Sequence, residues 1–174
     1  MAIDMADSDL LIDVDNLTRR FPRCEALGGV SFQIRRGEVA GLLGPNGSGK
    51  TTTLRILAGY LAPTSGRVEV AGHDVTAESR ETRRRIGYLP ESGPLYPEMR
   101  SDEYLSFRGR FRGLRGPRLA ARLREVIEQC GLGDCSRRVI GTLSRGYRQR
   151  TGVADCLLLQ PDVLLLDEPL AGLD

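Results

Sequence analysis

The sequence has no tryptophan and only four cysteines, one histidine and one lysine in 174 residues. The cysteines are too scattered for a disulfide framework (Cys24, Cys130, Cys135 and Cys156). Cys130 and Cys135 also lack the spacing of a metal site, and neither a histidine nor a second cysteine pair follows them. We therefore expect free thiols in a reducing compartment, and a fold that depends on a packed core, which a chain of this length can bury.

Long apolar runs are absent as well. The longest, such as residues 163–166, are far shorter than a membrane span. The first ten residues, MAIDMADSDL, include acidic residues and no apolar stretch, so we expect no signal peptide and a loose, disordered segment over residues 1–9. If the protein works at a membrane, we expect another chain to supply the membrane-spanning part.

Basic charge is almost entirely arginine. Lys50 is the only lysine among 25 basic residues, and 17 of the 24 arginines lie between Arg80 and Arg150, with 8 acidic residues in the same stretch. A solvated face on arginine-rich helices would explain this bias; so would an acidic partner, a membrane surface or RNA. RNA is the least favoured, because no aromatic residues alternate with the arginines as base stacking requires.

The apolar pattern predicts strands that alternate with helices. The expected strands are 10–17, 30–34, 39–43, 67–70, 86–89 and 163–166, and the expected helical segments are 50–60, 101–130 with a break at 113–117, and one that begins near residue 144. Strands that alternate with helices imply a parallel sheet, and the early strands suggest a small antiparallel sheet beside it. The expected fold class is therefore α/β.

A glycine-rich segment between the expected strand 39–43 and helix 50–60 fits the phosphate-loop pattern G-x-x-x-x-G-K-[ST] in full. Its residues are Gly44, Pro45, Asn46, Gly47, Ser48, Gly49, Lys50 and Thr51, followed by Thr52. The glycines allow backbone N–H groups to turn toward phosphates, at the positive end of the following helix. Lys50 would reach the β- and γ-phosphates of a nucleoside triphosphate, and the Thr51 hydroxyl would join the magnesium shell. A chance match in a chain of this length is roughly one in a hundred or less.

A second motif is the apolar run 163–166, which ends in Asp167 and Glu168. An acid at the end of an apolar strand is placed to hold a magnesium ion bound at a phosphate loop. Alternation along a strand puts the neighbouring Glu168 on the other side, where it could accept a proton from an attacking water. Such a run is more often a plain strand end, but downstream of a phosphate loop it indicates a catalytic site.

Between the two motifs lies the octapeptide 143–150, LSRGYRQR, which by itself reads as a loop entering a helix with Ser144 as N-cap. At this distance before the acidic strand end it resembles the LSGGQ signature of the ATP-binding cassette (ABC) family. Other landmarks follow that family's order: Phe21 lies where the family places an aromatic residue that stacks on adenine, residues 86–91 (IGYLPE) resemble the Q-loop, and residues 171–174 (AGLD) resemble the D-loop.

The resemblance covers about residues 10–174 and implies an ABC ATP-binding domain. Its fold would be a P-loop NTPase core with a small N-terminal antiparallel β subdomain and a helical subdomain inserted at about 92–150. The family's reaction is hydrolysis of ATP to ADP and phosphate, with Mg²⁺. Lys50, Thr51, Asp167 and Glu91 would hold the phosphates and magnesium, and Glu168 would serve as general base.

The resemblance also implies partners. In the family two such domains face each other head to tail, so Ser144 and Gly146 would contact the γ-phosphate bound to the partner domain. Separate transmembrane permease subunits would receive the closing motion through the helical region, which places the ATPase in the cytoplasm, on the inner face of the cell membrane. No nucleic acid is expected as a partner.

Three departures qualify the resemblance. Glu91 stands where the Q-loop has glutamine, and Arg145 replaces the first glycine of the signature; both variants favour an exporter. The family's switch histidine follows the D-loop, whereas His73 lies far upstream, so we expect a domain truncated after the D-loop that hydrolyses ATP slowly by itself. The alternatives are a soluble ABC ATPase without a transport role and a fragment that binds nucleotide without hydrolysis.

Overall fold

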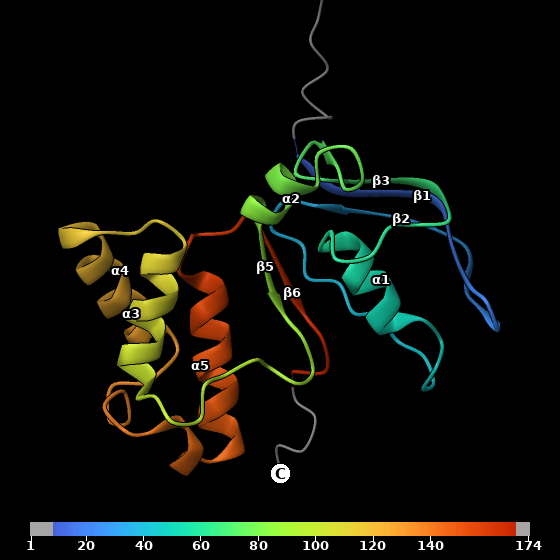
Figure 1. The fold of residues 1–174 in the computed structure, drawn as a ribbon. Coiled ribbons are helices and arrows are strands. Elements are labelled where there is room, and N and C mark those ends of the chain that lie inside the picture. The colour runs from blue at the N-terminus through green and yellow to red at the C-terminus, as the bar shows by residue number, and fades with distance from the viewer. Residues whose placement is uncertain (1–8, 170–174) are drawn as a thin grey trace, which may run out of the picture. The chain divides into compact units, whose positions relative to one another are not determined.

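The computed structural model describes residues 9–169, which fall into two compact units that divide after Ile86. Figure 1 shows the elements of both units. The expectations for residues 1–8 and for the D-loop residues 171–174 lie outside the described residues. Each unit is described by itself.

The first unit is built on a four-stranded antiparallel sheet with the order β2-β1-β3-β4. Its strands are β1 (Leu10–Phe21), β2 (Cys24–Arg35), β3 (Ser65–Val70) and β4 (His73–Asp74). Apolar side chains at alternate positions of β1, Ile12 and Val14, pair with Val70 and Val68 of β3 and are buried with them. The predicted small antiparallel sheet is thus confirmed. Its first two strands extend beyond the predicted ranges, because they continue through register shifts into a tight hairpin that pairs Phe21 with Cys24.

Two helices complete this unit. Helix α1 (Lys50–Leu57) follows the glycine-rich segment and packs against the sheet with the buried residues Leu54, Ile56 and Leu57 (Figure 1). Helix α2 (Ser79–Arg85) leads to the boundary between the units. The predicted helix after the phosphate loop is confirmed, although it ends three residues earlier than expected.

The predicted strand at residues 39–43 is wrong. In the described structure these residues have no strand geometry, and Val39 and Leu43 are 100% and 95% exposed. An apolar run becomes a strand only where a neighbouring strand accepts its backbone hydrogen bonds and other elements cover its side chains. The four strands of this unit pair among themselves, and Gly41 in the middle of the run adds no side chain for packing.

The second unit contains a two-stranded sheet and three longer helices. Strands β5 (Ile86–Leu89) and β6 (Val163–Leu166) pair with each other, and both have the predicted bounds. The helices are α3 (Ser101–Phe111), α4 (Gly116–Gln129) and α5 (Arg145–Leu157), with a 3₁₀ turn at Ile140–Thr142. The core is a cluster of buried side chains from these helices and the segments between them (Tyr104, Leu105, Val126, Leu132, Cys135, Ile140, Leu143, Ala154 and Leu158).

In the second unit, two glycines allow neighbouring elements to pack closely. A Cβ added at Gly109 of α3 would lie 2.6 Å from Leu119 Cδ1 of α4, and one at Gly152 of α5 would lie 2.7 Å from Leu89 Cδ1 of β5. A larger side chain at either position would require the facing leucine side chain to move. Across residues 9–169, no helix combines the length and apolar character that spanning a membrane would require.

Candidate nucleotide-binding site

The phosphate loop is an exposed turn whose conformation requires glycine at its end. Gly47 and Gly49 have φ angles of 82° and 92°, in the left-handed region that glycine adopts without strain. A Cβ on Gly49 would also lie 2.6 Å from the carbonyl oxygen of Ala26 and from Leu27 Cδ2. The loop therefore meets strand β2 at Gly49, and α1 begins at the next residue.

Lys50 folds back over this loop. Its Nζ donates to the carbonyl oxygens of Gly44 at 2.9 Å and Pro45 at 3.1 Å. The N-cap of α1 is Gly49, which has no side chain to cap the helix, and the first turn of α1 contains no acidic residue. An ammonium group and the positive end of a helix thus lie together at an exposed loop, an arrangement that attracts anions. The residues present fit a triphosphate.

Magnesium would find few protein ligands here. Among residues 9–169, no group of three or more His, Cys, Asp or Glu residues could hold a metal ion by itself. This fits the chemistry of Mg²⁺, which is usually bound by one or two protein oxygens together with substrate phosphates and waters. Thr51 of the first unit carries a hydroxyl oxygen and Asp167 of the second unit carries carboxylate oxygens, both of a kind that Mg²⁺ accepts.

Phe21 ends β1 at the tip of the β1–β2 hairpin, and its ring is 38% exposed. The same hairpin continues to Ala26 and Leu27, the residues that Gly49 contacts, so the structure brings Phe21 and the phosphate loop to one region of the first unit. The guanidinium carbon of Arg19 lies 4.6 Å from the centre of the ring. The Arg19 guanidinium therefore covers part of the ring, and the rest of Phe21 is partly exposed.

Asp167 and Glu168 follow β6 and differ sharply in exposure. Asp167 is 2% exposed, and its backbone N–H donates to the carbonyl of Leu89 at 2.9 Å, which extends the pairing of β6 with β5. Glu168 is exposed and has a φ of 49°, so the chain leaves strand geometry there. Glu91 lies two residues beyond Leu89 and is also exposed. Three acidic residues thus follow the carboxyl ends of the paired strands β5 and β6.

The signature segment lies at the beginning of α5. Ser144 is its N-cap, and the Ser144 hydroxyl accepts a hydrogen bond from the backbone N–H of Tyr147 at 3.4 Å. Gly146 lies in the first turn, which contains no acidic residue, and Arg145 at the first position is exposed. The predicted helix start is confirmed, and its positive end is reinforced by arginine.

Comparison with known proteins accounts for this combination of loop, strand ends and helix start. The profile of the family described as ABC transporter matches residues 27–171. The chain belongs to the ABC transporter family. The structure also has a TM-score of 0.85 with cbiO1 from Clostridium perfringens, described as part of the ABC transporter complex cbiONQ; the two chains are 29% identical, and the match covers 95% of this chain and 68% of the other.

Two curated ABC relatives are similarly close in sequence. An uncharacterized ABC transporter ATP-binding protein, YxlF of Bacillus subtilis (strain 168), is 41% identical over 94% of this chain and 54% of its own length. The daunorubicin resistance ATP-binding protein DrrA3 of Streptomyces coeruleorubidus is 41% identical over 96% of this chain and 53% of its own length. The chain spans about half the length of these curated relatives.

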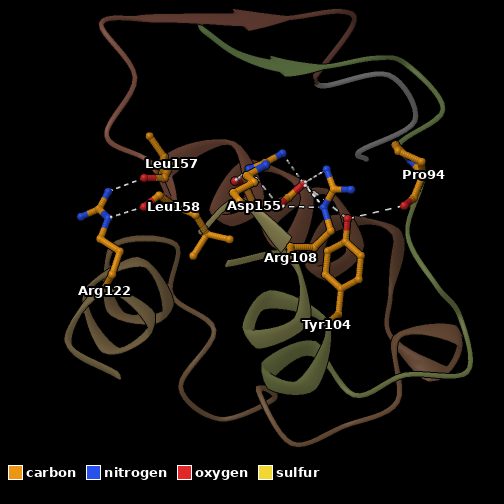
Figure 2. A network of polar contacts seen from close by, with 8 residues as sticks. Pro94, Tyr104, Arg108, Arg122, Asp155, Leu157 and Leu158 are labelled. Carbon is orange, nitrogen blue, oxygen red and sulfur yellow. Dashed lines mark hydrogen bonds and ion pairs between the residues drawn. The ribbon is translucent and has the colours of Figure 1, made fainter. Parts of the chain in front are cut away.

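Sequence reasoning missed one polar cluster of this ABC domain. Asp155 of α5 is 7% exposed and contacts Tyr104 and Arg108 of α3, as Figure 2 shows. It also pairs with Arg112, which follows α3 directly. Burial raises the pKa of Tyr104 above its ordinary value, and the charge of Asp155 adds to the increase. Burial alone would lower the pKa of Arg108, but the hydrogen bond and charge of Asp155 raise it overall. The only sign of this cluster in the sequence is that Asp155 lies between two small apolar residues, Ala154 and Cys156.

The arginine bias is explained in part by this cluster. Arg108 and Arg112 pair with Asp155, and Arg122 is itself buried and donates to the carbonyl oxygens of Leu157 and Leu158. These three arginines stabilise the packing of helices, whereas others in the 80–150 stretch, such as Arg145 and Arg148, are exposed. The expected solvated face therefore describes only some of the arginines.

Proposed function

We propose that this chain is the ATP-binding and hydrolysing part of an ABC transporter, and that the transporter is an exporter. The observation that carries the proposal is the phosphate loop: Lys50 folded over Gly44 and Pro45 at the uncapped N-terminus of α1. Membership of the ABC transporter family supports a transport role. Export is supported by relatives whose names refer to daunorubicin resistance and to Nod factor export.

In this proposal each residue of the loop has a defined task. The backbone N–H groups of Gly47 to Thr52 and the Lys50 ammonium bind the β- and γ-phosphates, where hydrogen bonds to charged groups are about twice as strong as neutral ones. Thr51, Asp167 and Glu91 hold the magnesium ion and its waters; when bound, the ion neutralises charge that develops on the phosphates. Phe21, which is 38% exposed at the hairpin tip, stacks on adenine.

Glu168 is the proposed general base. It is exposed beside the buried Asp167, so it can meet water while Asp167 stays at the sheet edge. A carboxylate in this role accepts a proton from the water that attacks the γ-phosphorus, and such catalysis typically contributes about 10²–10⁴-fold. Glu91, on the same edge, is the second carboxylate that could take this proton.

A second ABC domain would complete the site. We propose a head-to-tail pair in which Ser144 and Gly146 contact the γ-phosphate held by the partner domain. The N-terminus of α5 suits this contact, because Ser144 is exposed at the positive end of the helix and the first turn contains no acidic residue.

Separate membrane subunits are the proposed receivers of the closing motion, and the protein would lie in the cytoplasm against the inner face of the cell membrane. An exposed aromatic row, defined as Tyr96, Phe107 and Phe111, supports a protein partner. Its ring centres lie 5.9 Å apart between Tyr96 and Phe107 and 6.4 Å apart between Phe107 and Phe111. Contiguous exposed aromatic side chains are typical of docking surfaces.

The test compares Lys50→Ala with Arg55→Ala, an exposed basic residue in the last turn of the same helix. Removing the Lys50 charge should cost about 1.5–3 kcal/mol of ATP binding, or roughly ten- to a hundredfold in affinity by calorimetric titration. Arg55→Ala should bind ATP normally. In the same series Glu168→Gln should bind ATP and lose about 10²-fold or more of its turnover. Equal ATP affinity in Lys50→Ala and Arg55→Ala would show that the loop is not the binding site.

A further inference from the structure

Helix α5 is attached to α3 through Asp155, in a cluster that we call the clamp: Asp155 with Tyr104, Arg108 and Arg112. Arg108 Nε lies 3.2 Å from both carboxylate oxygens of Asp155. The guanidinium of Arg112 lies 3.2 Å from Oδ1 and donates to the backbone carbonyl of Asp155 at 2.6 Å. The Tyr104 hydroxyl donates to Oδ2 at 3.4 Å. Figure 2 shows Tyr104 and Arg108 pointing toward this carboxylate.

The C-terminal end of α5 is attached to α4 by a different arginine. Arg122 donates from Nε to the carbonyl oxygen of Leu158 at 3.1 Å and from Nη2 to the carbonyl oxygen of Leu157. The last turn of α5 contains no basic residue of its own. Arg122 therefore supplies the positive charge and the donors that the end of this helix lacks (Figure 2).

The clamp fixes the direction of a helix whose other end is the signature. Ser144 and Asp155 are eleven residues apart along α5, a helical rise of about 16 Å. A tilt of only ~10° about Asp155 would move Ser144 by about 3 Å, which is the full length of a hydrogen bond. A small tilt of α5 at the clamp thus produces a large displacement of the signature residues.

We infer that Asp155, held by Arg108, Arg112 and Tyr104, is a positioning residue that aligns the α5 N-terminus for the phosphate of the partner domain. The inference rests on the proposed function of Ser144 and Gly146. The geometry of the contacts favours this positioning role for Asp155 over a role in stability alone. Arg112 bonds both the side chain and the backbone of one residue, and the planar fork of Arg108 reaches both carboxylate oxygens, so the contacts fix the orientation of α5 as well as its proximity to α3.

Tyr104 also joins the clamp to the surface. Its ring packs edge-on against Tyr96 of the aromatic row, with ring centres 5.7 Å apart and planes at 88°. The same side chain bonds Asp155 through its hydroxyl. The groups that align α5 are therefore in direct contact with the surface that we propose for the membrane partner.

The experiment uses the protein in its natural assembly and compares Asp155→Asn with Glu81→Gln. Asparagine keeps the shape of the side chain but removes its charge, and Glu81 forms an exposed pair with Arg84 on α2, so Glu81→Gln controls for the loss of an ion pair as such. Binding sites are counted with a non-hydrolysable ATP analogue, and turnover is expressed per binding site so that unfolded chains do not enter the rate.

We expect Asp155→Asn to bind the analogue as the parent does, since Lys50 and the loop N–H groups that we propose to hold the phosphates are not part of the clamp. Its turnover per site should fall by about tenfold or more, because misplacement of a positioning group by ~1 Å can cost up to about 10²-fold. Glu81→Gln should keep the parental turnover. Hydrogen exchange should rise at the first turn of α5 in Asp155→Asn and stay unchanged in α1.

Arg108→Lys provides the second variant, in case Asp155→Asn does not fold. Lysine keeps the charge but loses the two-pronged contact, so turnover per site should fall while binding is kept. Parental turnover per site in a folded Asp155→Asn or Arg108→Lys protein overturns the inference, and so does a loss of analogue binding that parallels the loss of turnover. A parent assembly that neither binds nor hydrolyses ATP refutes the proposed function itself, which separates the two failures.

Discussion

Asp155 illustrates how a buried charge becomes tolerable in this protein. Its carboxylate is 9% exposed, whereas the Arg108 and Arg112 side chains are 24% and 26% exposed. The arginines can therefore keep part of their hydration while the acid loses nearly all of its own. Two guanidinium groups and a tyrosine hydroxyl replace that hydration, and removal of one partner from such a group typically destabilises a protein by about 3–5 kcal/mol. The carboxylate is therefore tolerated in the interior only while these three partners are present.

Cysteine reactivity gives a prediction at the same scale. Burial raises the pKa of Cys156 to about 12, with a further increase from Asp155, and burial also raises the pKa of Cys135, whereas Cys24 is exposed. At pH 8 only about 10⁻⁴ of Cys156 would be thiolate, the reactive form. Iodoacetamide should therefore modify Cys24 long before Cys156 or Cys135, as measured by peptide mass spectrometry, and denaturation should equalise the three.

The same shift makes stability depend on pH in a defined direction. Above the ordinary pKa of a thiol, the unfolded chain loses a proton from Cys156 that the folded chain keeps until about pH 12. The free energy of unfolding should thus decrease as the pH rises through this window. Comparable labelling of Cys24 and Cys156 in the folded protein would contradict the buried position of Cys156.

At the scale of elements, prediction succeeded where one segment carries its own signal. The start of α5 at Ser144 and the strand Val163–Leu166 follow from local capping chemistry and a run of apolar residues. The segment 39–43 has an equally apolar sequence but no strand partner in its unit, and pairing is a property of two segments. Asp155 was missed for the same reason, since its partners lie more than 40 residues away along the chain.

The junction between the phosphate loop and α1 depends on glycine. Gly49→Ala should destabilise the protein more than Gly47→Ala, although both glycines have positive φ. Either alanine costs about 1–2 kcal/mol in the left-handed region. At Gly49 the new Cβ would also lie 2.6 Å from Ala26 O, whereas no atom lies within 4 Å at Gly47, so overpacking adds roughly 1–3 kcal/mol.

Urea unfolding without nucleotide measures this difference in the free energy of unfolding directly, because ligand binding then does not contribute to the stability of either variant. The strain term is common to the two substitutions, so their difference reports the contact between the loop and β2. Equal free energies of unfolding for the two variants would mean that Gly49 and Ala26 are not in close contact.

At the scale of the whole molecule, the proposed chemistry is divided between the two units. The phosphate loop and Phe21 belong to the first, and Glu91, Ser144, Asp167 and Glu168 belong to the second. Several ordered motifs along one chain are sufficient to predict the family, because each lies at the end of an element that its own residues define. They do not predict which surface meets a partner, since exposed aromatic residues on helices have no sequence pattern that separates them from core residues.

The aromatic row can be tested as the surface that meets the partner. Phe111 is 78% exposed and Phe107 is 44% exposed, so replacing both with serine should cost the fold little. Aromatic residues at the centre of an interface commonly contribute about 2 kcal/mol or more each, equivalent to roughly 30-fold in affinity. We expect the double variant Phe107→Ser/Phe111→Ser to keep its ATP affinity and to lose most of the membrane subunit that co-purifies with the parent protein.

Tyr60 provides the matched control, because it is an aromatic residue of the first unit that is 67% exposed and lies outside the aromatic row. Tyr60→Ser also replaces an exposed aromatic ring with serine and should leave co-purification unchanged. If the double variant retains its membrane partner as well as Tyr60→Ser does, the docking surface lies elsewhere. The contact of Tyr96 with Tyr104 would then stabilise the helical core without any part in coupling, because a signal from the membrane subunit would have to reach α5 by another route.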